Sequence, residues 1–98
     1  GVAVELPPGC VGLVFPRSGL ASKSGITLSN AVGVIDSGYR GEIHVALLNV
    51  SDETVTLEAG TRVAQMVVMP FVPCEVIAVD ELGDTERGED GFGSTGVE

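Results

Sequence analysis

The segment Pro16-Arg17-Ser18-Gly19 combines residue types that suit a phosphate group. A guanidinium presents a charged fork that matches two phosphate oxygens, a serine hydroxyl donates to a third, and a glycine lets the backbone approach closely. The same residues also make an ordinary turn, and the local pattern alone favours that simpler interpretation. Phosphate binding at Arg17, Ser18 and Gly19 is therefore a hypothesis that depends on other motifs.

A second candidate is the run of residues 33–41, Gly-Val-Ile-Asp-Ser-Gly-Tyr-Arg-Gly. Two apolar arms joined by a polar turn predict a hairpin with Asp36 near its tip. An Asp in such a turn usually bonds to nearby backbone N–H groups, but it can also be a base that orients a water molecule. Tyr39, the single tyrosine, is either a half-buried strand residue or a surface against which a sugar or base packs.

Other polar side chains have weaker signals. The amide of Gln65 lies in an apolar run and needs a hydrogen-bond partner, either in the protein or in a ligand. We predict that His44, the single histidine, is a core or interface residue rather than a catalyst. Cys10 and Cys74 have no neighbouring Cys or His at metal-ligand spacing, so we predict two reduced thiols.

The elements that position these residues are predicted to be strands. Short runs rich in Val, Ile and Leu alternate with frequent turn signals, which is typical of an all-β sandwich or barrel. The run 1–6 alternates from its start, so we expect the chain to begin inside a strand of a longer protein. Further strands are expected at 43–48 (central, covered on both faces), 54–57 (one solvated face), 63–69 (mainly buried) and 75–79, with one helical turn around 17–22.

The composition changes near the end of the chain, which divides it into a β core, 1–79, and an arm, 80–98. The arm holds seven acidic residues, one arginine and five glycines, so we expect it to be mobile. A solvated tail is the simpler interpretation. However, closely spaced glycines let N–H groups approach an anion, Ser94 and Thr95 can donate to it, and Phe92 can cap a flat ligand.

Charge and hydropathy exclude several partners. Fourteen acidic residues against five basic ones give a net charge of −9, which disfavours polymeric nucleic acid and anionic membranes. The longest apolar stretch without a charge, Val63–Val72, is too short to span a membrane, and no leader peptide is recognisable. Reduced cysteines then favour the cytoplasm, and the small core favours self-association.

Four segments together resemble a known family. Residues 17–21, 33–41, 62–65 and 87–96 are similar, in order and spacing, to the second to fifth motifs of trimeric dUTP diphosphatases (dUTPases). The resemblance implies an all-β, jelly-roll-like β-barrel or sandwich with a flexible C-terminal arm. It also implies a homotrimer with active sites shared between subunits, which hydrolyses dUTP to dUMP and diphosphate with Mg²⁺. Such an enzyme limits uracil in DNA and supplies dUMP for dTTP synthesis.

The resemblance also implies roles for single residues. Asp36 would orient the water that attacks the α-phosphorus, and Tyr39 would lie under the sugar, leaving no space for a 2′-hydroxyl. Asn30 and the hairpin backbone from Gly33 would read the uracil edge. The arm would fold over a neighbouring subunit's site, with Phe92 stacked on uracil. The phosphate contacts would come from Arg17, Ser18, Gly19 and Gln65 of the core and from Arg87, Gly93, Ser94 and Thr95 of the arm.

The sequence departs from the family pattern at two points. The family's first motif, whose Asp helps to hold the Mg²⁺ waters, is not found in these residues, so no metal ligand is expected in this chain. Asp90 stands where the family usually has Gly, and an added charge near phosphates would weaken closure of the arm if it pointed inward.

Two alternatives to a dUTPase stay open. A relative of the dCTP deaminase type shares the fold, although Tyr39 and the glycine-rich arm count against it. The second is a catalytically silent β module that trimerises or binds a protein partner.

Overall fold

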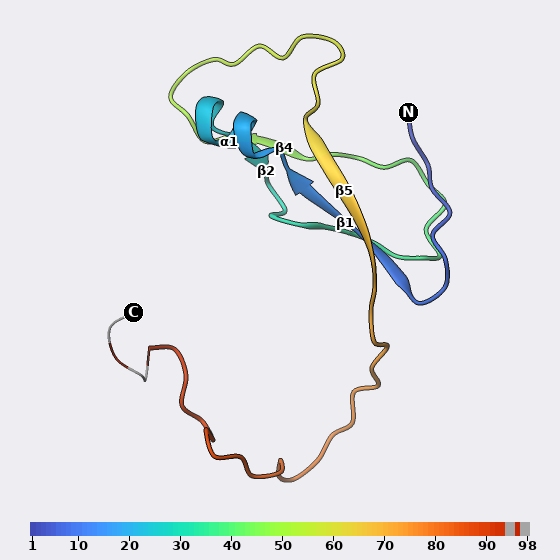
Figure 1. Ribbon diagram of the computed structural model, residues 1–98, viewed down its shortest axis with the longest axis vertical. Coiled ribbons are helices and arrows are strands. Elements are labelled where there is room, and N and C mark those ends of the chain that lie inside the picture. The colour runs from blue at the N-terminus through green and yellow to red at the C-terminus, as the bar shows by residue number, and fades with distance from the viewer. Residues whose placement is uncertain (94–95, 97–98) are drawn as a thin grey trace.

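The computed structural model describes residues 1–93 and 96 of the chain, and its regular structure there is mostly β (Figure 1). The elements are β1 (Cys10–Pro16), α1 (Ser18–Ser24), β2 (Ile26–Leu28), β3 (Gly33–Ile35), β4 (Leu47–Asn49) and β5 (Ala64–Pro70). In these described residues no helix is long and apolar enough to cross a lipid bilayer. The predicted all-β class is therefore confirmed.

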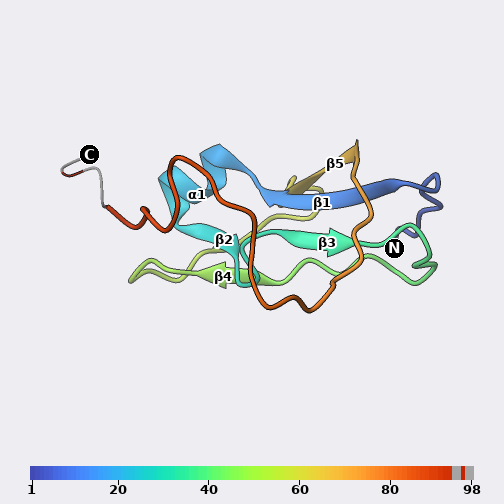
Figure 2. The ribbon, with the colours of Figure 1, turned by 90° about the horizontal axis from the view of Figure 1, so that it is seen from below.

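Strand β1 is the centre of a three-stranded antiparallel sheet in the order β3-β1-β5. It pairs with β5 over its whole length, from Cys10 opposite Pro70 to Pro16 opposite Ala64. On its other edge it pairs with β3 over three residues, from Gly12 opposite Ile35 to Val14 opposite Gly33. Strands β2 and β4 form a separate two-stranded sheet, which lies against the first as a second layer (Figure 2).

A small apolar core lies between the layers. Alternate residues of a strand point to the same face, so Ile26 and Leu28 of β2 are both buried while Thr27 between them is not. Val14 of β1 and Leu6 complete the buried hydrophobic set of the described residues. Gly12 of β1 is also buried, and a Cβ there would lie 3.1–3.3 Å from Met66, Leu6 and Ile35. Glycine at this position therefore lets three segments approach β1 closely.

The predicted helical turn is confirmed and extends two residues further, as α1. Arg17, just before it, is still extended (φ −89°, ψ 127°). Gly25 ends the helix in the left-handed conformation (φ 70°), and its N–H donates to the Ala21 carbonyl at 3.0 Å. The sharp stop turns the chain directly into β2.

Several predicted strands are wrong or incomplete. Residues 54–57 and 75–79 form no strand, and the run 1–6 contributes only an isolated bridge between Ala3 and Glu42. Of the predicted strand 43–48, only its end is regular, within β4. A strand forms only where a neighbouring edge supplies hydrogen-bond partners. The runs 54–57 and 75–79 find no such edge within the described residues, and the run 1–6 finds only the bridge at Ala3 and the bond from the Ile43 N–H to the Val2 carbonyl.

Two burial predictions are also wrong. The strand at 63–69 exists as β5, but its residues from Gln65 to Pro70 are exposed. Leu47 and Leu48, expected to be covered on both faces, are 40% and 44% exposed. A strand that is apolar on both faces needs a layer on each side, and this chain supplies only one.

The run 33–41 does not pair with itself as the predicted hairpin. Its first arm is β3, which pairs with β1, and its second arm forms no strand. The predicted turn is present, because the Tyr39 N–H donates to the Asp36 carbonyl at 3.1 Å. The β1 edge thus takes the place of the second arm.

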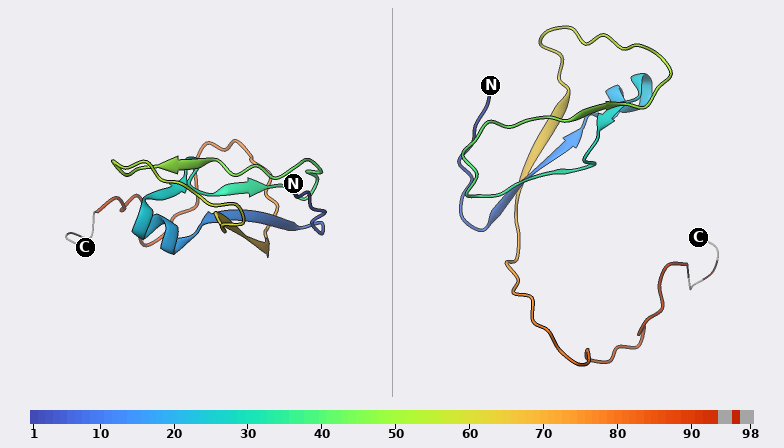
Figure 3. Two further views of the ribbon diagram at one scale, coloured as in Figure 1. Left: turned by 90° about the horizontal axis from the view of Figure 1, so that it is seen from above. Right: turned by 180° about the vertical axis from the view of Figure 1, so that it is seen from behind.

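The shape is open rather than spherical. The radius of gyration is 18.9 Å, against about 13 Å for a compact domain of this length. The accessible surface is 8088 Å², against about 5200 Å² for a compact monomer of the same mass. Residues 71–93 contribute strongly, because they leave β5 and run away from both sheets without forming a helix or strand (Figure 3).

Candidate functional site

The first cluster of predicted site residues lies where β1 ends and α1 begins. Arg17, Ser18, Gly19, Arg62 and Gln65, with Leu20, line an open cavity of about 430 Å³. We call this the phosphate cavity. It contains two guanidinium groups, a hydroxyl, an amide and an accessible glycine backbone, and its lining includes no acidic side chain. This donor set suits a chain of phosphate groups.

The register of β1 and β5 assembles this cavity from two distant segments. Pro16 is paired with Ala64, so continuing the antiparallel register brings Arg62 beside the start of α1. The Gln65 amide nitrogen donates to the Pro16 carbonyl at 3.0 Å, which supplies the partner that its apolar run required. This bond ties β5 to the residue that precedes Arg17.

Arg62 is a cavity residue to which the sequence reasoning assigned no role, although it lies in one of the matched segments. Its spacing from Gln65 within the run was visible in the sequence. The sequence did not show how near Arg62 lies to Arg17, because that distance depends on the strand register.

The second cluster lies around the turn that follows β3. Asp36 and Tyr39 line a cavity of about 230 Å³ together with Val34, Ile35, Glu42 and His44. We call this the turn cavity. Arg40 holds the turn, because its guanidinium donates to the Ser37 carbonyl at 2.7 Å and to the Tyr39 carbonyl at 3.3 Å.

Asp36 is exposed, and within the described part of the chain its carboxylate makes no hydrogen bond. Only its main-chain carbonyl is used in the turn. The carboxylate is therefore free to accept a hydrogen bond from water or a ligand.

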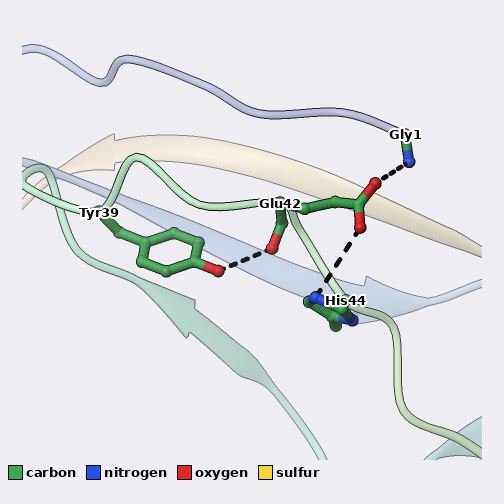
Figure 4. Close-up of polar contacts among 4 residues, drawn as sticks. All are labelled: Gly1, Tyr39, Glu42 and His44. Atoms are coloured by element: carbon green, nitrogen blue, oxygen red, sulfur yellow. Dashed lines mark hydrogen bonds and ion pairs between the residues drawn. The ribbon is translucent and has the colours of Figure 1, made fainter.

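Tyr39 is held by its hydroxyl group, which donates to the Glu42 carbonyl at 2.7 Å (Figure 4). The carboxylate of Glu42 points the other way, toward the Gly1 amino group and, at 4.0 Å, His44. The side chain of His44 is 80% exposed, so of the two predicted places, core or interface, the core is excluded and the interface stays a prediction.

Asn30 and Gly33 are close neighbours at the start of β3. A Cβ at Gly33 would lie 3.4 Å from the Asn30 amide nitrogen and 3.2 Å from Val14 Cβ. Between them the chain turns tightly, with Ala31 at φ 61° and a bond from the Val32 N–H to the Asn30 carbonyl. The polar amide and the backbone of this turn thus lie together.

The two cavities lie toward opposite ends of β1. Ile35, the residue before Asp36, is paired with Gly12, whereas Arg17 follows the last residue of the strand. Five residues of extended chain separate Gly12 from Arg17, which corresponds to roughly 16 Å. One chain therefore does not bring the Asp36 carboxylate and the phosphate cavity to the same point.

The arm residues are not brought to either cavity. Arg87 Nε donates to the Asp90 carbonyl and the Gly88 N–H donates to the Thr85 hydroxyl, so these polar contacts of the arm are local. Phe92 is fully exposed, and neither cavity is lined by Arg87 or Gly93. The predicted site residues Ser94 and Thr95 lie outside the described residues.

The described residues include no cluster of three His, Cys, Asp or Glu side chains that could hold a metal ion. The phosphate cavity would repel a free cation, because its charged groups are guanidiniums. Cys10 and Cys74 are free thiols, as predicted, with Cys10 half-buried and Cys74 exposed.

Comparison with known proteins decides the family. The family model described as dUTPase matches residues 1–96. The chain belongs to the dUTPase family. A deoxyuridine 5′-triphosphate nucleotidohydrolase of Cutibacterium acnes is 56% identical, over 99% of this chain and 64% of its own length. One of Beijerinckia indica is 55% identical, over 98% of this chain and 60% of its own. The chain thus spans less than two thirds of these two dUTPases.

Solved dUTPase structures confirm the jelly-roll fold. The dUTPase of Staphylococcus bacteriophage 80alpha with dUPNHPP is 32% identical, with a TM-score of 0.83 over 97% of this chain and 72% of that one. A mutant of the same phage dUTPase with dUpNHpp reaches a TM-score of 0.84. The four segments that resembled dUTPase motifs therefore lie on a dUTPase fold.

The geometry of the phosphate cavity predicts that Arg62 binds phosphate. Replacing it with glutamine should weaken binding of inorganic diphosphate about ten- to hundredfold, because a charge-assisted hydrogen bond is lost. Isothermal titration of the complete protein measures this. The matched control is Arg40→Gln, since Arg40 lies outside the cavity, and equal affinities of the two variants would contradict the assignment.

Proposed function

We propose that the protein hydrolyses dUTP to dUMP and diphosphate, with a water molecule attacking the α-phosphorus. The observation that carries this proposal is the phosphate cavity, where two arginines, Ser18 and Gln65 converge without any acidic neighbour. Membership of the dUTPase family supports it, as do relatives named deoxyuridine 5′-triphosphate nucleotidohydrolase and a phage dUTPase structure with dUpNHpp. Together they support a nucleoside triphosphate as the ligand.

In this mechanism Arg17, Ser18, Gly19 and Gln65 contact the phosphate chain, and Arg62 adds a second positive charge. Fixed donors of this kind stabilise the charge that develops on the leaving diphosphate. They also hold the α-phosphorus in line with the attacking water, which removes much of the entropic cost of the reaction. The overall charge of −9 opposes binding, so the local donors must outweigh it.

Asp36 is the residue that orients the attacking water. Its carboxylate is exposed and makes no hydrogen bond among the described residues, so it can accept one from water and one from the 3′-hydroxyl of the sugar. Tyr39 lines the same cavity and lies under the deoxyribose. Asn30 and the backbone beginning at Gly33 read the uracil edge, where unmatched polar groups would reject another base.

The site is shared between subunits of a homotrimer. Continuing the β1–β3 register places Asp36 opposite Val11, six residues or roughly 20 Å from Arg17. This is too far for both residues to act on one α-phosphorus, so a neighbouring chain supplies one of them. The exposed apolar side chains of β4 and β5 support association. The excess accessible surface of the isolated chain supports it as well.

The described residues do not fit as direct ligands of Mg²⁺, so the ion would come with the triphosphate as its counter-ion. The two free thiols support a reducing compartment, the cytoplasm, as the place of the reaction. There the enzyme limits uracil in DNA and supplies dUMP for dTTP synthesis.

The arm, 80–98, is the lid of a neighbouring subunit's site, separate from the β core 1–79. Arg87, Gly93, Ser94 and Thr95 contact the terminal phosphates, and Phe92 stacks on uracil. The exposure of Phe92 supports this role, because an aromatic ring in solvent gains from covering a base. Closure would exclude water other than the attacking molecule.

The Asp36→Asn variant tests the reaction. Diphosphate release from dUTP should fall by about 10²–10⁴, the usual contribution of a general base, while an Asp52→Asn control keeps its rate. Turnover close to wild type would remove Asp36 from the mechanism. Ammonia release from dCTP, without diphosphate release from dUTP, would instead identify a deaminase.

A mixing experiment tests the shared site. Asp36→Asn and Arg17→Ala chains should each be nearly inactive alone, but co-expression should restore activity, because some mixed sites contain both wild-type residues. The control pairs Asp36→Asn with the double variant, from which no such site can be built. Mixed chains no more active than this control would place both residues in one chain's site.

Truncation after Glu86 tests the lid. Removing the phosphate contacts of the arm should lower turnover about tenfold or more, while the far-ultraviolet circular dichroism of the β core is unchanged. Truncation after Gly96 is the control and should keep activity. Unchanged kinetics in the shorter protein would refute a role for the arm in catalysis.

A further inference from the structure

Gly41 and Tyr39 are in unusually close contact in the turn cavity region. A Cβ placed on Gly41 would lie 2.6 Å from Tyr39 Cζ and 2.9 Å from Cε1, and closer still to the hydroxyl oxygen. Real Cβ atoms do not approach other atoms this closely. The phenol end of the ring therefore occupies the volume that any other residue at position 41 would fill.

The same ring is fixed at its tip and at its base. Its hydroxyl donates to the main-chain carbonyl of Glu42, the residue after Gly41 (Figure 4). At its base, the Arg40 guanidinium bonds to the Ser37 and Tyr39 carbonyls. The ring thus folds back across Gly41 and bonds just beyond it.

We propose that Gly41 is a positioning residue for substrate selection: its missing side chain sets the position of Tyr39, and through it the preference for deoxyribose over ribose. This inference rests on the proposed dUTP hydrolysis, in which Tyr39 lies under the sugar. Nothing in the reaction requires Gly41 to touch the nucleotide. It acts through the ring that does.

The structure indicates which part of the molecule moves when position 41 gains a methyl group. The backbone at Gly41 has no positive φ angle, so alanine adopts its conformation without strain. The clashing atoms belong to the far end of the Tyr39 side chain, which is 42% exposed and has room to swing. The ring therefore moves while the fold stays, and the bond to the Glu42 carbonyl breaks.

The displaced ring should change the preference for dUTP over UTP more than it changes the rate of hydrolysis. Asp36 and the phosphate cavity do not depend on position 41, so kcat for dUTP should change little. The space next to the sugar opens, so KM for UTP should fall relative to KM for dUTP. We expect the ratio of kcat/KM for dUTP to that for UTP to fall about threefold to tenfold, the factor associated with one hydrogen bond.

The experiment compares Gly41→Ala with Gly38→Ala in the complete protein. Gly38 lies in the same turn, but a Cβ there meets nothing within 4 Å. The difference in near-ultraviolet circular dichroism between each protein and its Tyr39→Phe counterpart isolates the tyrosine band of Tyr39. Gly41→Ala should change this band and lower the dUTP/UTP ratio, and Gly38→Ala should do neither.

A double-mutant cycle with Tyr39→Phe tests whether Gly41 acts through the Tyr39 ring. Phenylalanine lacks the hydroxyl that lies nearest Gly41, so Gly41→Ala should lower the ratio less in that background than in wild type. Equal effects in both backgrounds would overturn the proposal. So would an unchanged tyrosine band, or a changed band with an unchanged ratio.

Different results would refute the proposed function and this inference. Wild-type protein that does not hydrolyse dUTP, or does not prefer it to UTP, would refute the function before any variant is made. The tyrosine band of Gly41→Ala would still decide whether Gly41 positions the ring.

Discussion

The antiparallel pairing of β1 with its two neighbours is the constraint on which the rest of the molecule depends. Pairing with β5 along the full strand brings Arg62 and Gln65 beside the residues that follow β1. Pairing with β3 on the opposite edge runs antiparallel over Gly12–Val14, so the chain leaves β3 toward the start of β1 and places Asp36 away from them. The strand therefore acts as a spacer between phosphate-binding groups and the carboxylate.

This spacing gives the isolated chain two partial sites rather than one complete site. The phosphate cavity has donors but no base, and the turn cavity has a free carboxylate but no guanidinium in its lining. The exposed apolar residues of β4 and β5 point to the same explanation, since they need a surface that the chain does not supply. In the proposed homotrimer, assembly would resolve both deficits, because the same contacts would bury these apolar residues and bring the two partial sites together.

Small local features then set how each partial site behaves. The Gln65 bond to Pro16 ties β5 to the residue before the phosphate cavity, and the crowding of Tyr39 on Gly41 sets the position of the ring beside the turn cavity. In both places a main-chain carbonyl accepts the bond from the side chain. Such contacts position a group without depending on another side chain's rotamer.

The sequence by itself determined the local chemistry: the all-β class, the short helix after Arg17, the turn at Asp36 and the residue types that match dUTPase motifs. These follow from neighbours in the chain, because turn residues, apolar alternation and donor groups act over a few positions. The sequence did not predict correctly the strands at 54–57 and 75–79, the hairpin at 33–41 or the burial of β5.

Only the tertiary structure decided which edge each strand pairs with, that Arg62 joins the phosphate cavity, and that Asp36 lies away from it. It alone showed that Tyr39 lies on Gly41. The physical reason is that strand pairing joins residues far apart in sequence. Apolar alternation specifies that a face will be covered, but not which strand or which subunit covers it.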